Sequence, residues 1–323
     1  MTRTRLYRSG VLELENFPVH DISDYITKPG VTVWLDMCAP DAHDLATISE
    51  ELNLHRLAVE DAGQEHQRPK LDRYDSHLFV TCYGVDLDRN SGELETFEVA
   101  VFVTHNAMVT VRKSERFDID GVVARWDGSP DLAKHGVSFL LHGLLDYVVD
   151  GHFATVQTLD DEIEKLEDLL FDEKRPDLPV QRRSFELRKS LVRLRRVVLP
   201  MREVVNSLMR RDLHGFDDAM MPYYQDVYDH VLRANEWTES LRDLLTTVLE
   251  TNLTIQGNRL NVITKQVTSW AAIIAVPTAI TGFYGQNVPY PGFGHQSGFY
   301  VSAISIVVLS AGLYLLFRHR DWI

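Results

Sequence analysis

Residues 299–317 read FYVSAISIVVLSAGLYLLF, a run of 19 residues without a charge. A helix of this length spans about 28 Å, close to the hydrocarbon thickness of a bilayer. A soluble helix of the same length normally carries a polar face, which this stretch lacks. Arg318, His319 and Arg320 follow at once, and basic residues beside a span favour the cytoplasmic side. The sequence therefore predicts a membrane-spanning helix at residues 298–317 and a basic cytoplasmic tail at residues 318–323.

A second apolar stretch lies just upstream. No Asp, Glu, Lys or Arg occurs between Lys265 and Arg318, and Val267–Tyr284 is long enough for a further span. Lys265 marks its cytoplasmic end. A short loop at residues 288–297, VPYPGFGHQS, then joins the two spans outside the cytoplasm. We expect a multi-pass protein of the inner cell membrane, with lipid as a partner and both termini in the cytoplasm.

The net charge of the 323-residue chain is −14, and every acidic residue except Asp321 precedes the uncharged stretch. The acidity therefore belongs to a soluble part, which would repel nucleic acid. It is compatible with binding cations, although acidity can also serve solubility alone.

Motifs for other functions are missing from the sequence. The two cysteines, Cys38 and Cys82, are far apart and form no C-x-x-C pair, so neither a zinc ribbon nor a disulfide framework is expected. There is no H-E-x-x-H, P-loop, G-x-S-x-G or G-x-G-x-x-G pattern. No cleavable signal peptide is visible. We expect no enzyme and no organic cofactor, while a membrane-anchored receptor or enzyme remains an alternative.

Residues 1–145 predict an α/β domain. Four β-branched and aromatic runs have the length of strands; they are Val31–Leu35, His77–Tyr83, Phe97–Val103 and Ala107–Val111. The last two are separated by a His-Asn turn and are expected to pair as a hairpin. Residues 42–53 predict a helix that begins behind Pro40 and Asp41.

Long helices follow this domain. From Val137 onward apolar residues recur at helical spacing, and residues 146–221 predict a pair of long helices. A third segment, residues 222–287, has no proline between Pro222 and Pro277. The simplest interpretation is one stalk helix that begins in the cytoplasm and continues into the bilayer. The expected fold class is therefore an α+β membrane protein with an α/β cytoplasmic domain, a long helical stalk and two C-terminal spans.

The first span carries a stripe of small or polar residues at a 3-4-3-4 spacing: Asn261, Thr264, Thr268, Ala271, Ala275, Thr278 and Gly282. Such a stripe must face protein or water, because lipid cannot satisfy hydroxyl and amide groups. It is explained either by tight helix packing or by a pore wall built from several copies of the helix. Two spans cannot enclose a water-filled path, so conduction requires a ring of subunits.

The stretch that closes the first span, Tyr284-Gly285-Gln286-Asn287, resembles the Y-G-M-N motif of the CorA family of divalent-cation channels. Similar matches occur in the same order along nearly the whole chain. They include HQRPKLDRY at residues 66–74, LPMREVV at residues 199–205, YYQDVYDH at residues 223–230 and the terminal RHRDWI.

This resemblance implies a homopentameric funnel whose first span lines the pore. The selectivity filter would be Tyr284, Gly285, Gln286 and Asn287, with five Asn287 amide oxygens around the outer mouth. Neutral oxygens can hydrogen-bond the water shell of Mg2+ without holding the ion too tightly for release. A helix C-cap is the alternative role for Asn287. The implied pore-lining residues are Asn261, Thr264, Val267, Thr268, Ala271, Ala275, Thr278 and Gly282.

The family also binds regulatory Mg2+ between neighbouring cytoplasmic domains, which favours closure when the internal concentration is high. The acidic residues that match are Asp88, Asp226 and Glu250, with Asp86 nearby. The resemblance thus implies Mg2+ as both transported and regulatory ion, with Co2+ or Ni2+ also passing.

Two features depart from the family pattern. Gln286 replaces the usual methionine, and the loop at residues 288–297 has no acidic residue. The outer mouth then attracts cations less strongly, and His295 in the loop suits a softer metal. A zinc or other transition-metal transporter of the same superfamily is therefore an alternative.

Overall fold

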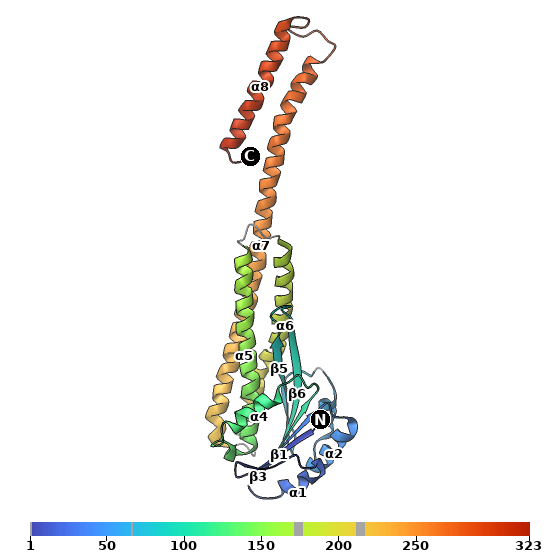
Figure 1. Ribbon diagram of the computed structural model, residues 1–323, viewed down its shortest axis with the longest axis vertical. Coiled ribbons are helices and arrows are strands. Elements are labelled where there is room, and N and C mark those ends of the chain that lie inside the picture. The colour runs from blue at the N-terminus through green and yellow to red at the C-terminus, as the bar shows by residue number, and fades with distance from the viewer. Residues whose placement is uncertain (1, 66, 171–176, 211–216) are drawn as a thin grey trace. The chain divides into compact units, whose positions relative to one another are not determined.

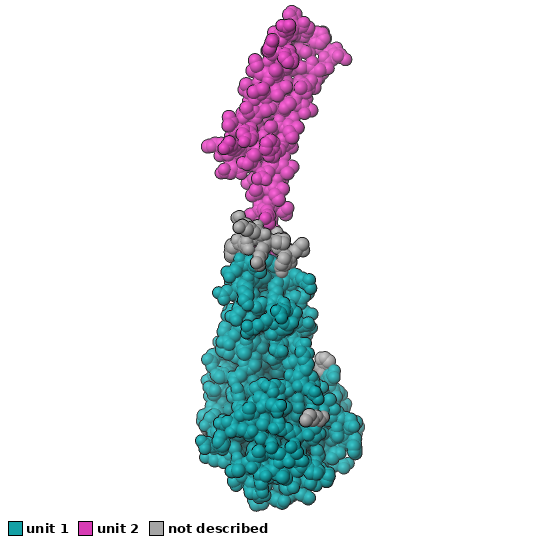
Figure 2. All heavy atoms as spheres, viewed as in Figure 1, with its two compact units in different colours: residues 1–248 teal, residues 249–323 magenta. Residues whose placement is uncertain are grey.

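The computed structural model describes residues 2–65, 67–170, 177–210 and 217–323 (Figure 1). The chain divides into two compact units, Met1–Val248 and Leu249–Ile323 (Figure 2). The described part of each unit is taken by itself below. The predicted match at residues 66–74 includes His66, which lies outside the described residues.

A seven-stranded sheet forms the base of the first unit, with the strand order β2-β1-β3-β7-β6-β5-β4. Its strands are β1 (Thr2–Arg8), β2 (Val11–Glu15), β3 (Val31–Cys38), β4 (Lys70–Arg73), β5 (Leu78–Leu87), β6 (Leu94–Val103) and β7 (Ala107–Arg112). Neighbouring strands are antiparallel except β3 and β7, which are parallel. All four predicted strands and the predicted β6–β7 hairpin are confirmed. The strands β1, β2 and β4 were not predicted, because β1 and β4 are rich in charged residues and β2 is only five residues long.

Short helices cover one face of this sheet: α1 (Ile22–Ile26), α2 (Ala42–Leu52) and α3 (Arg56–Gly63), with a 3-10 turn at Val19–Asp21. They bury an apolar cluster against the sheet that includes Ile48, Leu35 and Phe102. The predicted start of α2 is confirmed, since the Asp41 carboxylate accepts the backbone N–H groups of His43 and Asp44 in a capping box.

The other face packs against α4 (Ile119–Asp127) and the first of the long helices, α5 (Val137–Leu170). Trp34 on β3 and Trp126 on α4 meet edge to face there, with ring centroids 4.9 Å apart. Two 3-10 turns, Ala133–His135 and Asp218–Met220, precede α5 and α7.

The predicted long helices are confirmed as α5, α6 (Asp177–Leu208) and α7 (Met221–Tyr284). Within the first unit these helices share an apolar core with the β5–β6 hairpin, and its members recur at helical spacing, for example Leu187, Leu191 and Leu194 on α6. The hairpin thereby inserts Leu87 and Leu94 between the helices.

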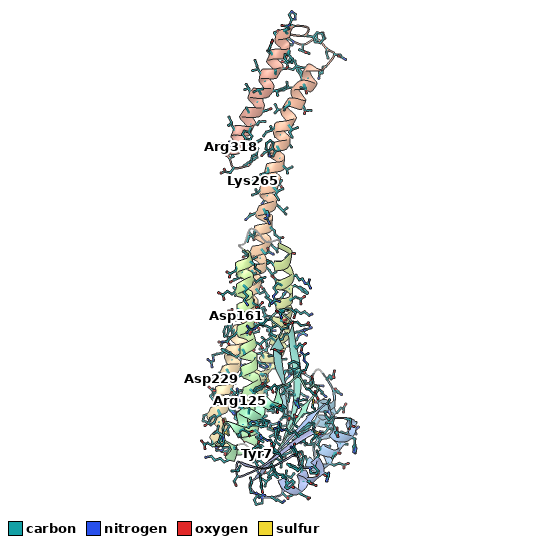
Figure 3. The ribbon with its side chains drawn as sticks, in the orientation of Figure 1. Tyr7, Arg125, Asp161, Asp229, Lys265 and Arg318 are labelled. Carbon is teal, nitrogen blue, oxygen red and sulfur yellow. The ribbon has the colours of Figure 1, made fainter. Side chains whose placement is uncertain are left out.

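The second unit contains the end of α7, from Leu249, and the last helix, α8 (Gln296–His319). Both helices are long and apolar enough to cross a membrane, and in their most apolar stretches only 6% of α7 and 0% of α8 is buried. Exposed apolar surface of this extent is unfavourable in water, so these two helices are suited to contact with lipid. In Figure 3, Lys265 on α7 and Arg318 on α8 lie at the same end of this helical hairpin.

Candidate functional site

The small and polar stripe of α7 is uncovered in the single chain. Every residue expected to line a pore is exposed, including Val267; these are Asn261, Thr264, Val267, Thr268, Ala271, Ala275, Thr278 and Gly282. The stripe continues toward the first unit through exposed Gly257, Thr254 and Glu250.

The covered side of α7 carries different residues. Ser269 is buried, and Ala272, Ile273, Val276 and Ile280 are partly buried. At 3.6 residues per turn, the mean direction of this side differs from that of the stripe by roughly 135°. The covering element is α8, whose Tyr314 ring approaches that of Trp270 at 6.4 Å. The stripe therefore points away from α8 and is left uncovered within the described part of this unit.

Hydroxyl groups along this helix differ in their partners. Thr278 donates to the Ile274 carbonyl at 3.0 Å, and Thr281 donates to the Pro277 carbonyl at 2.8 Å. Pro277 has no backbone N–H, so the carbonyl four residues earlier, that of Ile273, loses its helical partner. In the described part of the chain no hydrogen bond is found for the hydroxyls of Thr264 and Thr268, which leaves them able to bind water or a hydrated ion.

The segment expected to be the filter begins where α7 ends, at Tyr284. The Gly285 N–H still donates to the Thr281 carbonyl at 2.8 Å, which closes the last turn. A Cβ atom at position 285 would lie 2.9 Å from that same carbonyl oxygen, so only glycine fits here without a shift. Gln286 and Asn287 follow outside the helix with exposed side chains.

A contact that sequence reasoning missed fixes the loop behind this segment. The Tyr290 hydroxyl donates to the Tyr284 carbonyl at 3.1 Å. The Tyr290 ring also packs edge to face on Tyr284, at 5.0 Å between centroids, and on Phe293, at 5.3 Å. The last carbonyls of a helix lack helical partners, and Tyr290 satisfies one of them. The only signal in the sequence was the density of aromatic residues around the loop.

Two glycines close the other side of the loop. Gly292 has a positive φ of 93°, which favours glycine. A Cβ atom at Gly298 would lie 2.7 Å from the Gly292 carbonyl oxygen. The start of α8 is therefore held against the loop by close backbone contact.

The four acidic residues expected to regulate the protein are all exposed. Asp86 and Asp88 lie at the end of β5 and in the β5–β6 turn, whereas Asp226 and Glu250 lie 24 residues apart on α7. Among the described residues, no candidate group of metal ligands contains any of the four. One chain by itself therefore does not assemble the expected regulatory site.

Asp88 also has a local structural role. Its carboxylate accepts the Asn90 N–H at 2.9 Å and the Ser91 hydroxyl at 2.8 Å. These two hydrogen bonds, the backbone one first, lower the pKa of the Asp88 carboxyl. The group is thus ionised at neutral pH and already organises the β5–β6 turn.

Comparison with known proteins connects this arrangement to a family. The profile of the family described as CorA-like Mg2+ transporter protein matches residues 30–319, most of the chain. The chain belongs to this family. A solved structure with the same fold is the complete structure of the CorA magnesium transporter from Methanocaldococcus jannaschii. It superposes with a TM-score of 0.80, covers 99% of this chain and 98% of that chain, and is 21% identical in sequence. The predicted α+β membrane fold is therefore confirmed.

Two curated CorA-like relatives match over almost their whole length. The putative metal ion transporter YfjQ of Bacillus subtilis is 30% identical over 314 residues, 96% of this chain and 94% of that protein. The cobalt/magnesium transport protein CorA of Thermotoga maritima is 27% identical over 325 residues, 97% of this chain and 92% of that protein. The relatives are thus named as transporters of metal ions.

The described ranges of the CorA-like chain contain one group of metal-type ligands, which was not predicted. Ligand atoms of Asp146 and Asp150 on α5 and of His230 on α7 lie within 4.8 Å of one another. Arg125 on α4 forms ion pairs with both carboxylates, at 2.7 Å to Asp150 (Arg125 is labelled in Figure 3). A cation there would compete with the bound guanidinium, so this group favours helix packing over metal binding.

Proposed function

We propose that the protein is a homopentameric channel that carries Mg2+ across the inner cell membrane, with Co2+ or Ni2+ as further substrates. The observation that supports it most is the uncovered stripe on α7, which points away from α8 and ends at Gly285-Gln286-Asn287. Because α8 packs against one side of α7, the polar side of α7 is free to face the central axis of a ring of subunits. Within the span, lipid would leave the exposed Thr268 hydroxyl without a partner, whereas a wet pore satisfies it.

The filter in this proposal is Tyr284, Gly285, Gln286 and Asn287. Five Asn287 side chains, exposed beyond the helix end, would present amide oxygens to the hydrated ion. The Gly285 turn brings backbone close to the same axis. Residues 222–287 form the stalk and pore helix, residues 298–317 the outer span, and residues 1–145 and 146–221 the cytoplasmic part, with residues 318–323 as the cytoplasmic tail.

Regulation would take place between subunits. Asp88, Asp226 and Glu250, with Asp86, are exposed and unassembled within one chain, as residues that meet across an interface would be. Intracellular Mg2+ bound between them would offset the repulsion among neighbouring acidic domains and favour a closed pore. Loss of the ion would loosen the ring.

Ion flux into proteoliposomes tests the transport function directly. Mg2+, Co2+, Ni2+ and Zn2+ are offered separately to the reconstituted full chain, and its mass in detergent gives the number of subunits. We expect a pentamer with Mg2+ flux. Zn2+ flux without Mg2+ flux would favour the transition-metal alternative, which the uncharged loop and His295 support. A protein that stays monomeric would reject the channel.

The filter is tested by Asn287→Ala, which we expect to abolish selective Mg2+ flux while the pentamer persists. Asn258→Ala is the matched control, because Asn258 is also an exposed amide and lies on α7, roughly 120° around the helix from the stripe. If the spans only anchored a receptor or enzyme, both variants would behave alike.

A further inference from the structure

The helix α6 is strongly basic in an otherwise acidic protein. Between Asp177 and Leu208 it has eight Lys or Arg residues and three Asp or Glu residues, whereas the whole chain has a net charge of −14. Some of these cations pair within the chain, as Arg183 does with Glu162 and Arg195 with Glu239. Others line a cavity beside β6, a strand that α6 contacts.

This cavity has a volume of about 920 Å³ and gathers four arginines against one glutamate. Arg193 and Arg196 lie on α6, Arg68 lies just before β4, and Arg116 lies just after β7. The glutamate is Glu95 on β6. We call this site the arginine cavity. Its volume lies within the range of small-molecule sites.

Two of these arginines are occupied by the protein. Arg193 donates to the Glu93 carboxylate at 3.1 Å and to the Leu94 carbonyl at 3.0 Å. Arg116 forms an ion pair with Glu95 and lies over the Phe97 ring at 5.4 Å from its centroid. These contacts fix two guanidinium groups at the wall, so that less side-chain entropy is lost when a ligand binds.

The other two are available. In the described ranges neither Arg68 nor Arg196 has an ion-pair partner, and both are exposed. The floor between them is apolar and buried, made by Leu94 and Val197. A concave apolar floor with unpaired guanidinium groups at its rim is suited to a ligand with an anionic group.

The edge of β6 adds a backbone donor. β7 pairs with β6 only from Val99 onward, so residues 94–98 have a free edge there. The Leu94 N–H points to that edge, since it donates to the Ser190 hydroxyl at 3.1 Å. Because N–H groups alternate in direction along an antiparallel strand, the Thr96 N–H points the same way and lies at the arginine cavity.

We propose that the arginine cavity binds a small phosphate-bearing anion. The guanidinium fork matches two phosphate oxygens at once and is the side chain best suited to this group. A carboxylate ligand would use fewer of the four arginines, whereas di- and triphosphates have enough oxygens to reach across the cavity. Binding would tie α6 to the free edge of β6. This inference goes beyond the proposed transport function and does not depend on it.

Isothermal titration of the purified full chain in detergent tests the proposal, with EDTA present so that no divalent cation bridges the ligand. The probes are orthophosphate, pyrophosphate, ATP and glycerol phosphate, the last representing a lipid headgroup. We expect saturable binding that tightens from orthophosphate to pyrophosphate or ATP and weakens with salt. Preferential binding of glycerol phosphate would assign the cavity to a lipid headgroup instead of a soluble phosphate.

The double variant Arg68→Gln/Arg196→Gln removes both unpaired cations. We expect the affinity to fall at least about tenfold, because each lost charge-assisted hydrogen bond has roughly that effect. Arg188→Gln/Arg202→Gln is the matched control, with the same charge change on exposed residues of α6 that do not line the cavity. The proposal is overturned if no probe binds, or if the two double variants bind equally well.

Discussion

The hydroxyl of Tyr290 offers the sharpest test of how the outer loop positions the filter. Tyr290→Phe removes only the hydrogen bond to the Tyr284 carbonyl, 3.1 Å long, and keeps the ring contacts with Tyr284 and Phe293. The net contribution of one such bond is about 0.5–1.5 kcal/mol. The equilibrium between docked and undocked loop should therefore shift about two- to twelvefold toward the undocked form.

Amide hydrogen exchange at Gly285 and Gln286 measures this shift directly. The Gly285 N–H donates to the Thr281 carbonyl at 2.8 Å, and the Gln286 N–H donates to the Phe283 carbonyl at 3.4 Å. Both hydrogen bonds belong to the turn at the end of α7, where the Tyr290 hydroxyl donates to the Tyr284 carbonyl. We expect both amides to exchange about two- to twelvefold faster, because this factor corresponds to the free energy of one hydrogen bond. In proteoliposomes the Tyr290→Phe variant should discriminate less among divalent cations than the unmodified protein, with a smaller effect on its total flux.

Tyr300→Phe is the control for this experiment. Tyr300 lies on α8, is 61% exposed, and its hydroxyl has no hydrogen bond in the described part of the chain. It should match the unmodified protein in exchange and in flux. If Tyr290→Phe also matched it, the hydroxyl would have no role in holding the filter segment, and the reasoning would be refuted.

Three further predictions concern the loop and the cytoplasmic unit. Gly298→Ala should displace the start of α8, because its Cβ would lie 2.7 Å from the Gly292 carbonyl oxygen; unchanged exchange in residues 285–298 would contradict this. Asp36→Asn should lower the free energy of unfolding by about 3–5 kcal/mol, because it leaves the buried Arg112 guanidinium, now 2.6 Å from Asp36, without its counter-charge; a loss under about 1 kcal/mol in chemical denaturation would be too small for that mechanism. Burial lowers the pKa of His152 to about 4, below its ordinary value of 6.5. Since the unfolded state then binds the extra proton, stability should fall as pH drops from about 6.5 to about 4, by about 3 kcal/mol. His152→Gln should flatten this part of the pH profile, and an unchanged slope in thermal unfolding would count against it.

The sequence was most informative where the signal is local. The helix that begins at Ala42 was predicted from Asp41 before it, and the capping box confirms that start. The β6–β7 hairpin followed from two β-branched and aromatic runs on either side of a His-Asn turn, and the long helices followed from apolar residues at helical spacing. Helix caps, strand alternation and hydropathy depend on neighbouring residues, so they are visible without a tertiary structure. The strands β1, β2 and β4 escaped because sheet pairing, not their composition, makes them strands; β2 and β4 lie at the two edges of the sheet, and β1 lies beside β2.

Two membrane-length helices near the C-terminal end, and the small and polar stripe on the first of them, can be read from the amino-acid order, because hydropathy and spacing repeat along one helix. Three other features required the folded chain: the side of α7 that α8 covers, the hydrogen bond from Tyr290 to the Tyr284 carbonyl, and the cavity that Arg68, Arg116 and Arg193 share. These contacts join residues that the chain path brings together, so no local spacing encodes them. Periodicity specifies the faces of an element, and packing specifies what each face meets.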